Sequence, residues 1–150
     1  MTLVELLGTR LKDDAVLQFF DDHQVGDVVY AFDRLHEGID DEYRAGAEAL
    51  GFEVVFNQDQ ELETVFCYAS PTEGFASVDP AITGVPFFSS PPEAESAAMA
   101  AGQRCAKGAA DIPGLGLKTS WVRHERADSW VHYEFRNSAL ALVTLSHRKS

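Results

Sequence analysis

Histidines beside carboxylates are the residues of this sequence whose types and spacing come closest to acid–base or metal chemistry. The five histidines are His23, His36, His124, His132 and His147. They occur in none of the HExxH, HxH or Cys/His spacings that bind metal. Strand alternation would put His132 and Glu134 on one face, near His124 of a neighbouring strand. This group is either the site of a small enzyme or ligand-binding domain, or a set of solvent-facing residues on a half-buried sheet.

The sequence also lacks the motifs of a catalytic nucleophile and of a phosphate-binding loop. The sequence has no GxSxG elbow, and the segment GQRCAKG at 102–108 lacks the order of a phosphate-binding loop. Cys67 falls in an expected strand, where a thiol packs as a small hydrophobic side chain. Cys67 and Cys105 form no CxxC pair, and we expect both to be reduced. We therefore expect no catalytic residue, no metal and no cofactor.

Two tryptophans near the chain's end have a different possible role. Trp121 and Trp130 lie among Arg123, Arg126 and Arg136. Tryptophan and arginine are enriched at the energetic centres of protein interfaces, although large aromatics in a sheet also serve as core. Both interpretations stay open at this stage.

Acidic residues are concentrated in the first half of the chain. The net charge is −12, and residues 1–80 hold 18 acids against 4 bases. Clusters such as Asp21-Asp22 and Asp40-Asp41-Glu42 are either solvated faces or a surface for a cationic partner. The negative charge argues against nucleic acid and anionic membranes as partners.

Helical patterns are short and occur in both halves of the chain. Leu3, Leu6 and Leu7 have helical spacing before Gly8, and an apolar stripe predicts a helix over 13–22. Residues 91–101 form the clearest helix, because Ser89-Ser90 precede Pro91-Pro92 and Gly102 follows. The Ala-rich segment 40–50 is either a helix or an irregular lead-in.

Period-two patterns predict the strands of one antiparallel sheet. A hairpin is expected from 52–56 and 61–68, and a meander from 119–126, 129–136 and 139–146. Residues 24–35 are ambiguous between strand and loop, and 70–90 and 102–117 are expected connections. These elements predict a single α+β domain over 1–150, with about five strands and two to four short helices packed on one face.

The order of these elements resembles that of small bacterial immunity proteins, the cytoplasmic inhibitors of polymorphic or contact-dependent toxins. The resemblance is carried by GFEVVFNQDQELETVFCYA, by the helix start SSPPEAESAAMAAG and by the closing WVHYEF and LALVTL. It implies a protein without an active site that binds and neutralises a cognate toxin. Because the sequence has no signal-peptide pattern and no apolar run of membrane-spanning length, we also expect a cytoplasmic location.

A toxin that attacks nucleic acid or nucleotides is often basic around its cleft, so an acidic surface would steer its association. The expected interface therefore consists of acidic residues from the first half of the chain, Asp21, Asp22, Glu37, Asp40, Asp41 and Glu42, with Glu53 and Glu63 if the hairpin's exposed face takes part. No oligomeric state is predicted.

Overall fold

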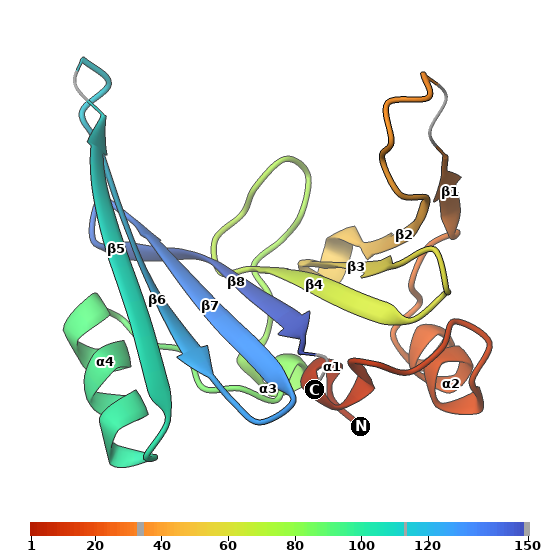
Figure 1. Cartoon of the computed structure of the whole chain (residues 1–150), viewed down its shortest axis with the longest axis horizontal. Coiled ribbons are helices and arrows are strands. Elements are labelled where there is room, and N and C mark those ends of the chain that lie inside the picture. The colour runs from red at the N-terminus through yellow and green to blue at the C-terminus, as the bar shows by residue number, and fades with distance from the viewer. Residues whose placement is uncertain (33–34, 113, 149–150) are drawn as a thin grey trace.

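Eight antiparallel strands form one open sheet in the computed structural model, which describes residues 1–32, 35–112 and 114–148 (Figure 1). The order across the sheet is β1-β2-β3-β4-β8-β7-β6-β5. The strands are β1 (Val29–Ala31), β2 (Glu42–Ala47), β3 (Phe52–Phe56), β4 (Leu62–Tyr68), β5 (Arg104–Ile112), β6 (Leu117–Glu125), β7 (Ser129–Arg136) and β8 (Ala139–His147). The α+β class is confirmed, but the prediction of about five strands is wrong.

The sheet consists of two four-stranded meanders joined at their last strands. Strands β1–β4 form the first meander and β5–β8 the second, and β4 pairs with β8 from Thr64↔Ser146 to Tyr68↔Leu142. The short helices are α1 (Leu3–Leu6), α2 (Asp14–Asp22), α3 (Pro80–Thr83) and α4 (Pro91–Ala100), with a 3-10 turn at Glu48–Leu50. Figure 1 shows the four α-helices on one side of a bent sheet, while the β1–β2 and β5–β6 hairpins extend toward the other side.

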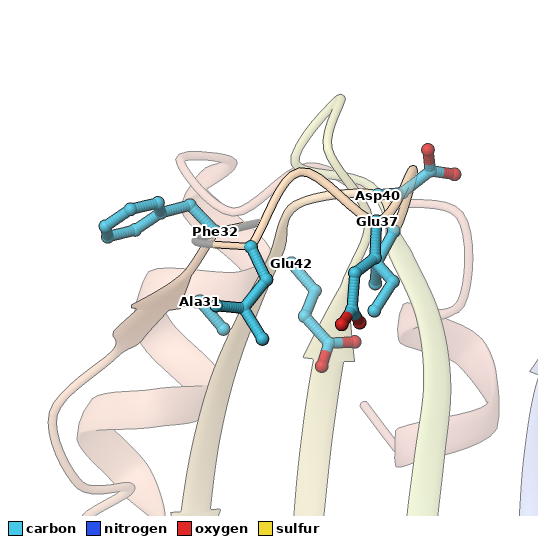
Figure 2. Close-up of a pocket in the computed structure, with 7 residues that line it drawn as sticks. Ala31, Phe32, Glu37, Asp40 and Glu42 are labelled. Carbon is cyan, nitrogen blue, oxygen red and sulfur yellow. The ribbon is translucent and has the colours of Figure 1, made fainter.

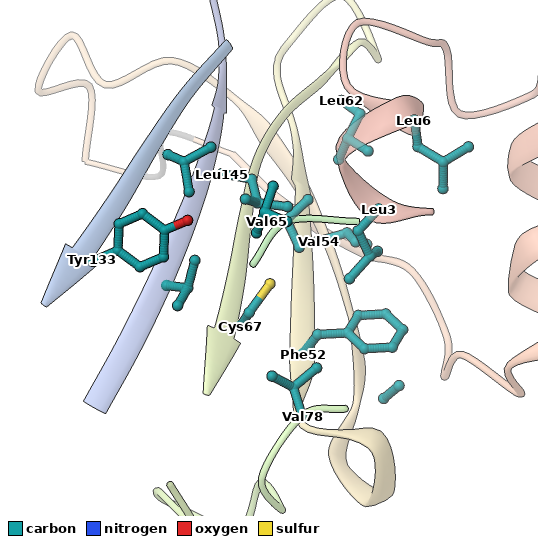
Figure 3. Packing of buried hydrophobic residues seen from close by; sticks show 14 of the residues in the cluster. Leu3, Leu6, Phe52, Val54, Leu62, Val65, Cys67, Val78, Tyr133 and Leu145 are labelled. Carbon is teal, nitrogen blue, oxygen red and sulfur yellow. The ribbon is translucent and has the colours of Figure 1, made fainter. Parts of the chain in front are cut away.

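The hydrophobic core lies between the sheet and the helices. Alternate residues of the central strands point into it, so that Val54 faces Val65 and Cys67 faces Val143 across neighbouring strands. Figure 3 shows Leu3 and Leu6 of α1 beside this layer, and both are fully buried. The strand face away from the helices is called the open face below.

Local sequence signals account for the two longer helices. The side chain of Ser90 accepts a hydrogen bond from the Glu93 N–H at 3.3 Å, which caps the start of α4. In α2, Val16 and Phe19 are buried on the predicted apolar stripe. Both helices were expected from the sequence, and their predicted positions are confirmed to within a residue or two.

Residues 42–47 form strand β2, so the helix or irregular lead-in predicted over 40–50 is wrong there. Ala45 and Ala47 are buried opposite Val54 and Phe52 of β3. Alanine favours helices as an isolated residue, but its small side chain also suits a strand that must lie under neighbouring groups. Pairing with the next strand, β3, therefore outweighed the local helix propensity of this segment.

Residues 104–112 form β5, although a connecting loop was predicted for 102–117. The segment RCAKGAADI has few β-branched residues, and its structure comes from continuous pairing with β6. In the ambiguous segment 24–35, only Val29–Ala31 is a strand, and residues 33 and 34 lie outside the described part of the chain. Helix α3, inside the expected 70–90 connection, was not predicted.

Candidate functional site

The acidic residues expected to form one interface are distributed over separate parts of the molecule. Glu37, Asp40 and Asp41 lie in the connection between β1 and β2, and Glu42 begins β2. Asp21 and Asp22 are exposed at the end of α2, and Asp22 lines a surface hollow with Gly46 and Ala47, at the other end of β2. Six residues of extended chain span roughly 17 Å, so these are two acidic groups and not one continuous surface.

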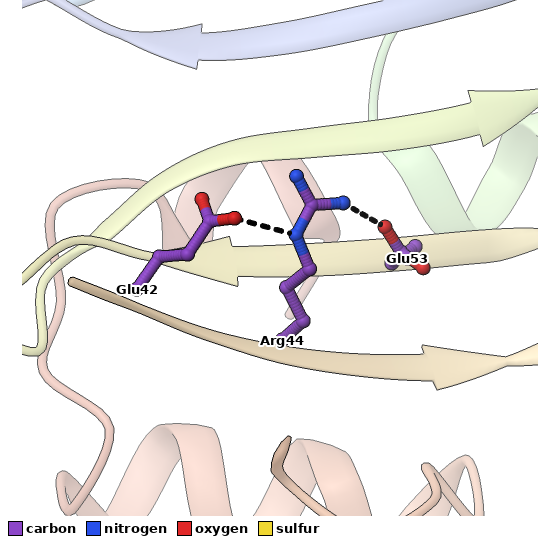
Figure 4. A network of polar contacts seen from close by, with 3 residues as sticks. All are labelled: Glu42, Arg44 and Glu53. Carbon is purple, nitrogen blue, oxygen red and sulfur yellow. Dashed lines mark hydrogen bonds and ion pairs between the residues drawn. The ribbon is translucent and has the colours of Figure 1, made fainter. Parts of the chain in front are cut away.

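Glu53 and Glu63 belong to neither of these two acidic groups. Glu63 is exposed at the irregularity where β4 shifts register against β3. Glu53 lies on the open face and accepts a hydrogen bond from Arg44 Nη1 at 2.8 Å, while Arg44 Nε donates to Glu42 at 2.9 Å (Figure 4). Burial alone would lower the pKa of Arg44, but the two carboxylates outweigh it and raise the pKa. Arg44 thus partly neutralises Glu42 and Glu53.

The β1–β2 arm, defined as Val29–Ala47, exposes an unusual number of large apolar side chains. Its first strand and the following connection hold Val29 (63% exposed), Tyr30 (48%), Phe32 (51%), Leu35 (76%) and Ile39 (62%). Soluble proteins normally expose such residues singly, and a contiguous apolar patch with a polar rim is typical of a binding surface. These residues were missed by the sequence reasoning, although the run VVYAF already showed an apolar segment among the acids.

Aromatic stacking organises the base of the arm. The ring of Tyr30 stacks against those of Phe32 and Tyr43, with centroid distances of 5.7 Å and 5.0 Å. The Tyr30 hydroxyl donates a hydrogen bond to Asp41, which raises the pKa of Tyr30 to about 12. Asp41 therefore helps to hold the arm's conformation, in addition to contributing charge.

A hollow of about 410 Å³ opens on the arm between apolar and acidic residues. Its walls come from Ala31, Phe32, Leu35, Glu37, Ile39, Asp40 and Glu42. Figure 2 shows the carboxylates of Glu37 and Glu42 directed to the same region, whereas that of Asp40 points away. Apolar walls with two carboxylates suit the methylene stem and charged head of a lysine or arginine.

The histidine group considered for catalysis does not converge. His124 pairs with Val131 on the helix-covered face, is 5% exposed, and places Nε2 2.8 Å from the Ala94 carbonyl oxygen. His132 lies on the open face, opposite Thr144 of β8. The expectation that His124 shares the open face with His132 and Glu134 is wrong, because paired residues share a face and this register puts the two histidines on opposite faces.

Trp121 and Trp130 lie half-buried on the open face and not in the core. The indole of Trp121 stacks on His132 at 5.2 Å, and the Arg123 guanidinium lies 4.5 Å from the Trp130 ring centre. Burial lowers the pKa of His132, as does the charge of Arg123, although Glu134 opposes the shift. Ring stacking and a cation–π contact therefore link the two tryptophans to polar neighbours on the open face.

The described residues contain no group of three or more His, Cys, Asp or Glu side chains placed to hold a metal ion. None of the helices seen there has the length and apolar character needed to cross a membrane. Cys67 and Cys105 are both free thiols, the first buried and the second exposed.

Comparison of the chain with protein-family models, with curated proteins and with solved structures found no match. Among the expected interface residues, Glu37, Asp40, Asp41 and Glu42 gather on this arm with the apolar patch. Asp21, Asp22, Glu53 and Glu63 lie outside its exposed tip.

Proposed function

We propose that this chain is a bacterial immunity protein that binds a cognate basic toxin in the cytoplasm and neutralises it through the β1–β2 arm. The observation that carries the proposal is the group of exposed apolar side chains Phe32, Leu35 and Ile39, which line one hollow together with Glu37, Asp40 and Glu42. The resemblance of the sequence to immunity proteins supplies the class of partner. Nothing in this proposal requires catalysis, since occupying or covering the toxin's cleft is sufficient.

The arm has the composition expected of a protein-binding element. Aromatic and aliphatic side chains supply the buried centre of an interface, and charged residues at the rim steer the encounter. In this proposal a basic side chain of the toxin enters the hollow between Glu37 and Glu42, while Phe32 and Leu35 cover apolar surface beside it. The projection of the arm from the sheet suits insertion into a concave site.

Immunity proteins are encoded beside their toxins, so the central experiment is co-expression of this chain with the product of the adjacent gene, with cell survival as the readout. Direct binding of the two purified proteins is then measured by biolayer interferometry. We expect Leu35→Ala to weaken binding at least about tenfold, because an apolar side chain at the centre of an interface is lost. Survival at limiting expression should fall in parallel.

Leu17→Ala is the matched control, because it makes the same substitution at a 52% exposed leucine on α2. It should leave binding within about twofold of the unmodified chain. Equal loss of affinity in both variants would place the interface elsewhere. Failure of the unmodified chain to bind or protect would contradict the proposed function itself.

A further inference from the structure

Strand β5 forms a long, regular edge of the sheet. Its nine residues pair with β6 in one continuous register, from Arg104↔Glu125 to Ile112↔Leu117. It is the last strand in the sheet order, so its other side has no neighbouring strand among the described residues. The opposite edge, β1, has three residues only. Long and regular edges present a row of backbone donors and acceptors to which another strand can pair.

The side chains of β5 allow a second backbone to approach. Its middle consists mainly of the small residues Ala106, Gly108, Ala109 and Ala110. The charged residues among them are Lys107 and Asp111, which are both exposed and lie two positions on either side of Ala109. Alternation puts Lys107, Ala109 and Asp111 on the same face of the strand.

We propose that the protein forms a symmetric dimer in which β5 of one copy pairs antiparallel with β5 of a second copy, centred on Ala109. In this register, Lys107 of each copy lies opposite Asp111 of the other, and Ala109 lies opposite its own counterpart. The two oppositely charged cross-strand pairs favour this register, which brings no like charges directly opposite each other. This inference is independent of the proposed toxin-binding function.

Exposed apolar side chains lie near both ends of β5. Leu115 in the β5–β6 turn is 74% exposed. The N–H of Gln103 donates to the Ala98 carbonyl at 3.0 Å, which holds the end of α4 beside the start of β5. Met99 of that helix is 80% exposed. An antiparallel partner strand runs between these two ends of β5.

Lys107 would then lie between two carboxylates. Its Nζ already contacts Glu95 of α4 at 2.8 Å, and 68% of its side chain is exposed. A flexible ammonium group with three donors can contact Glu95 and Asp111 of the second copy together. The existing ion pair is thus compatible with the dimer and orients Lys107 on the correct face.

Sedimentation velocity over a concentration series tests the dimer, with Lys107→Glu and Asp111→Lys as charge variants. We expect a species of twice the 16.5 kDa chain mass in the unmodified protein. Each variant alone should weaken dimerisation about tenfold or more, because two attractive pairs become repulsive. An equimolar mixture of the two variants should recover the dimer, since each heterodimer regains opposite charges at both pairs.

The design separates specific pairing from bulk repulsion between acidic molecules. Bulk repulsion alone predicts that Asp111→Lys, which reduces the negative charge, strengthens association. The proposed register predicts that it weakens association. A monomeric unmodified chain at all concentrations, or a mixture that dimerises no better than the separate variants, would overturn the proposal.

Cross-linking tests the register independently in a Cys105→Ser background. Ala109→Cys should form an intermolecular disulfide under mild oxidation, because paired residues have Cα atoms within disulfide range. Ala110→Cys lies opposite Gly108 of the second copy and should cross-link much more slowly. Faster cross-linking at position 110 than at 109 would exclude the centre at Ala109.

Discussion

At the scale of single residues, Gly51 shows how closely the 69–79 connection approaches the sheet. Gly51 has a φ of +79°, and a Cβ atom placed there would lie 2.2 Å from the Ala76 carbonyl oxygen. The Ala76 N–H donates to the Glu48 carbonyl at 2.8 Å, so this backbone is held in place. Neither the torsion angle nor the space permits a side chain at this position.

We therefore expect Gly51→Ala to reduce the free energy of unfolding by roughly 2–4 kcal/mol, from backbone strain and the collision with Ala76 together. Gly38 has the same φ of +79° and nothing within 4 Å of its added Cβ, which makes Gly38→Ala a matched control. Gly38→Ala should reduce the free energy of unfolding by about 1–2 kcal/mol, because only the backbone strain acts there and no collision adds to it. Urea unfolding measures both, and equal effects would argue against the close approach at Gly51.

At the scale of elements, the predictions that succeeded depend on signals within the element itself, and those that failed depend on pairing with another strand. The start of α4 was predictable because Ser90, Pro91 and Glu93 are adjacent in sequence. Strands β2 and β5 were not, because their alanines and glycines become strands only through pairing with β3 and β6.

The acidic residues of the candidate site could be predicted from the sequence, but their pairing and the exposure of the apolar residues beside them could not. The carboxylates of the arm were identified from clustering in the sequence. Which carboxylates pair with Arg44 could not be predicted, because Arg44 reaches Glu42 along its own strand and Glu53 on the next one. Exposure of Phe32 and Leu35 likewise depends on how the arm leaves the sheet.

Charge reversal on the arm should affect toxin binding more than the same reversal elsewhere. Glu37→Lys combined with Asp40→Lys should slow association with the toxin and flatten its dependence on salt, because local carboxylates steer the encounter. Both positions avoid the residues bonded to Tyr30 and Arg44. Association rates at several salt concentrations, measured by stopped flow, provide the readout.

The matched control for this experiment is Asp21→Lys with Asp22→Lys on α2. It changes the net charge by the same amount at the other end of β2. If the arm is the interface, the control should retain most of the association rate. Similar slowing in both double variants would mean that overall charge, and not the arm, governs association.

At the scale of the whole molecule, the pairing of β4 with β8 makes the two meanders parts of one sheet. Cys67 lies at this junction, fully buried beside Val143, and burial raises the pKa of its thiol above the ordinary range. Trp121 and Trp130 belong to the second meander. The Cys67 thiol therefore reports on the first meander, and the two tryptophans report on the second.

If the chain unfolds as a single domain, as predicted, both probes should give the same free energy of unfolding. Thiol labelling of Cys67 in a Cys105→Ser variant and tryptophan fluorescence during urea unfolding provide the two values. Agreement within about 1 kcal/mol is expected from a two-state transition. Labelling of Cys67 at lower urea than the fluorescence change would show that the first meander opens separately.

The position of β8 at the centre of the sheet also has a consequence for synthesis on the ribosome. Strands β1–β4 are complete by residue 68, but the strand that pairs with the outer side of β4 begins at Ala139. Until β8 emerges, the nascent chain carries β4 as an open and largely apolar edge, the kind of surface that invites mispairing. The eighth strand along the chain thus closes the middle of the sheet, and a chain cut before Ala139 lacks the strand that joins the two meanders.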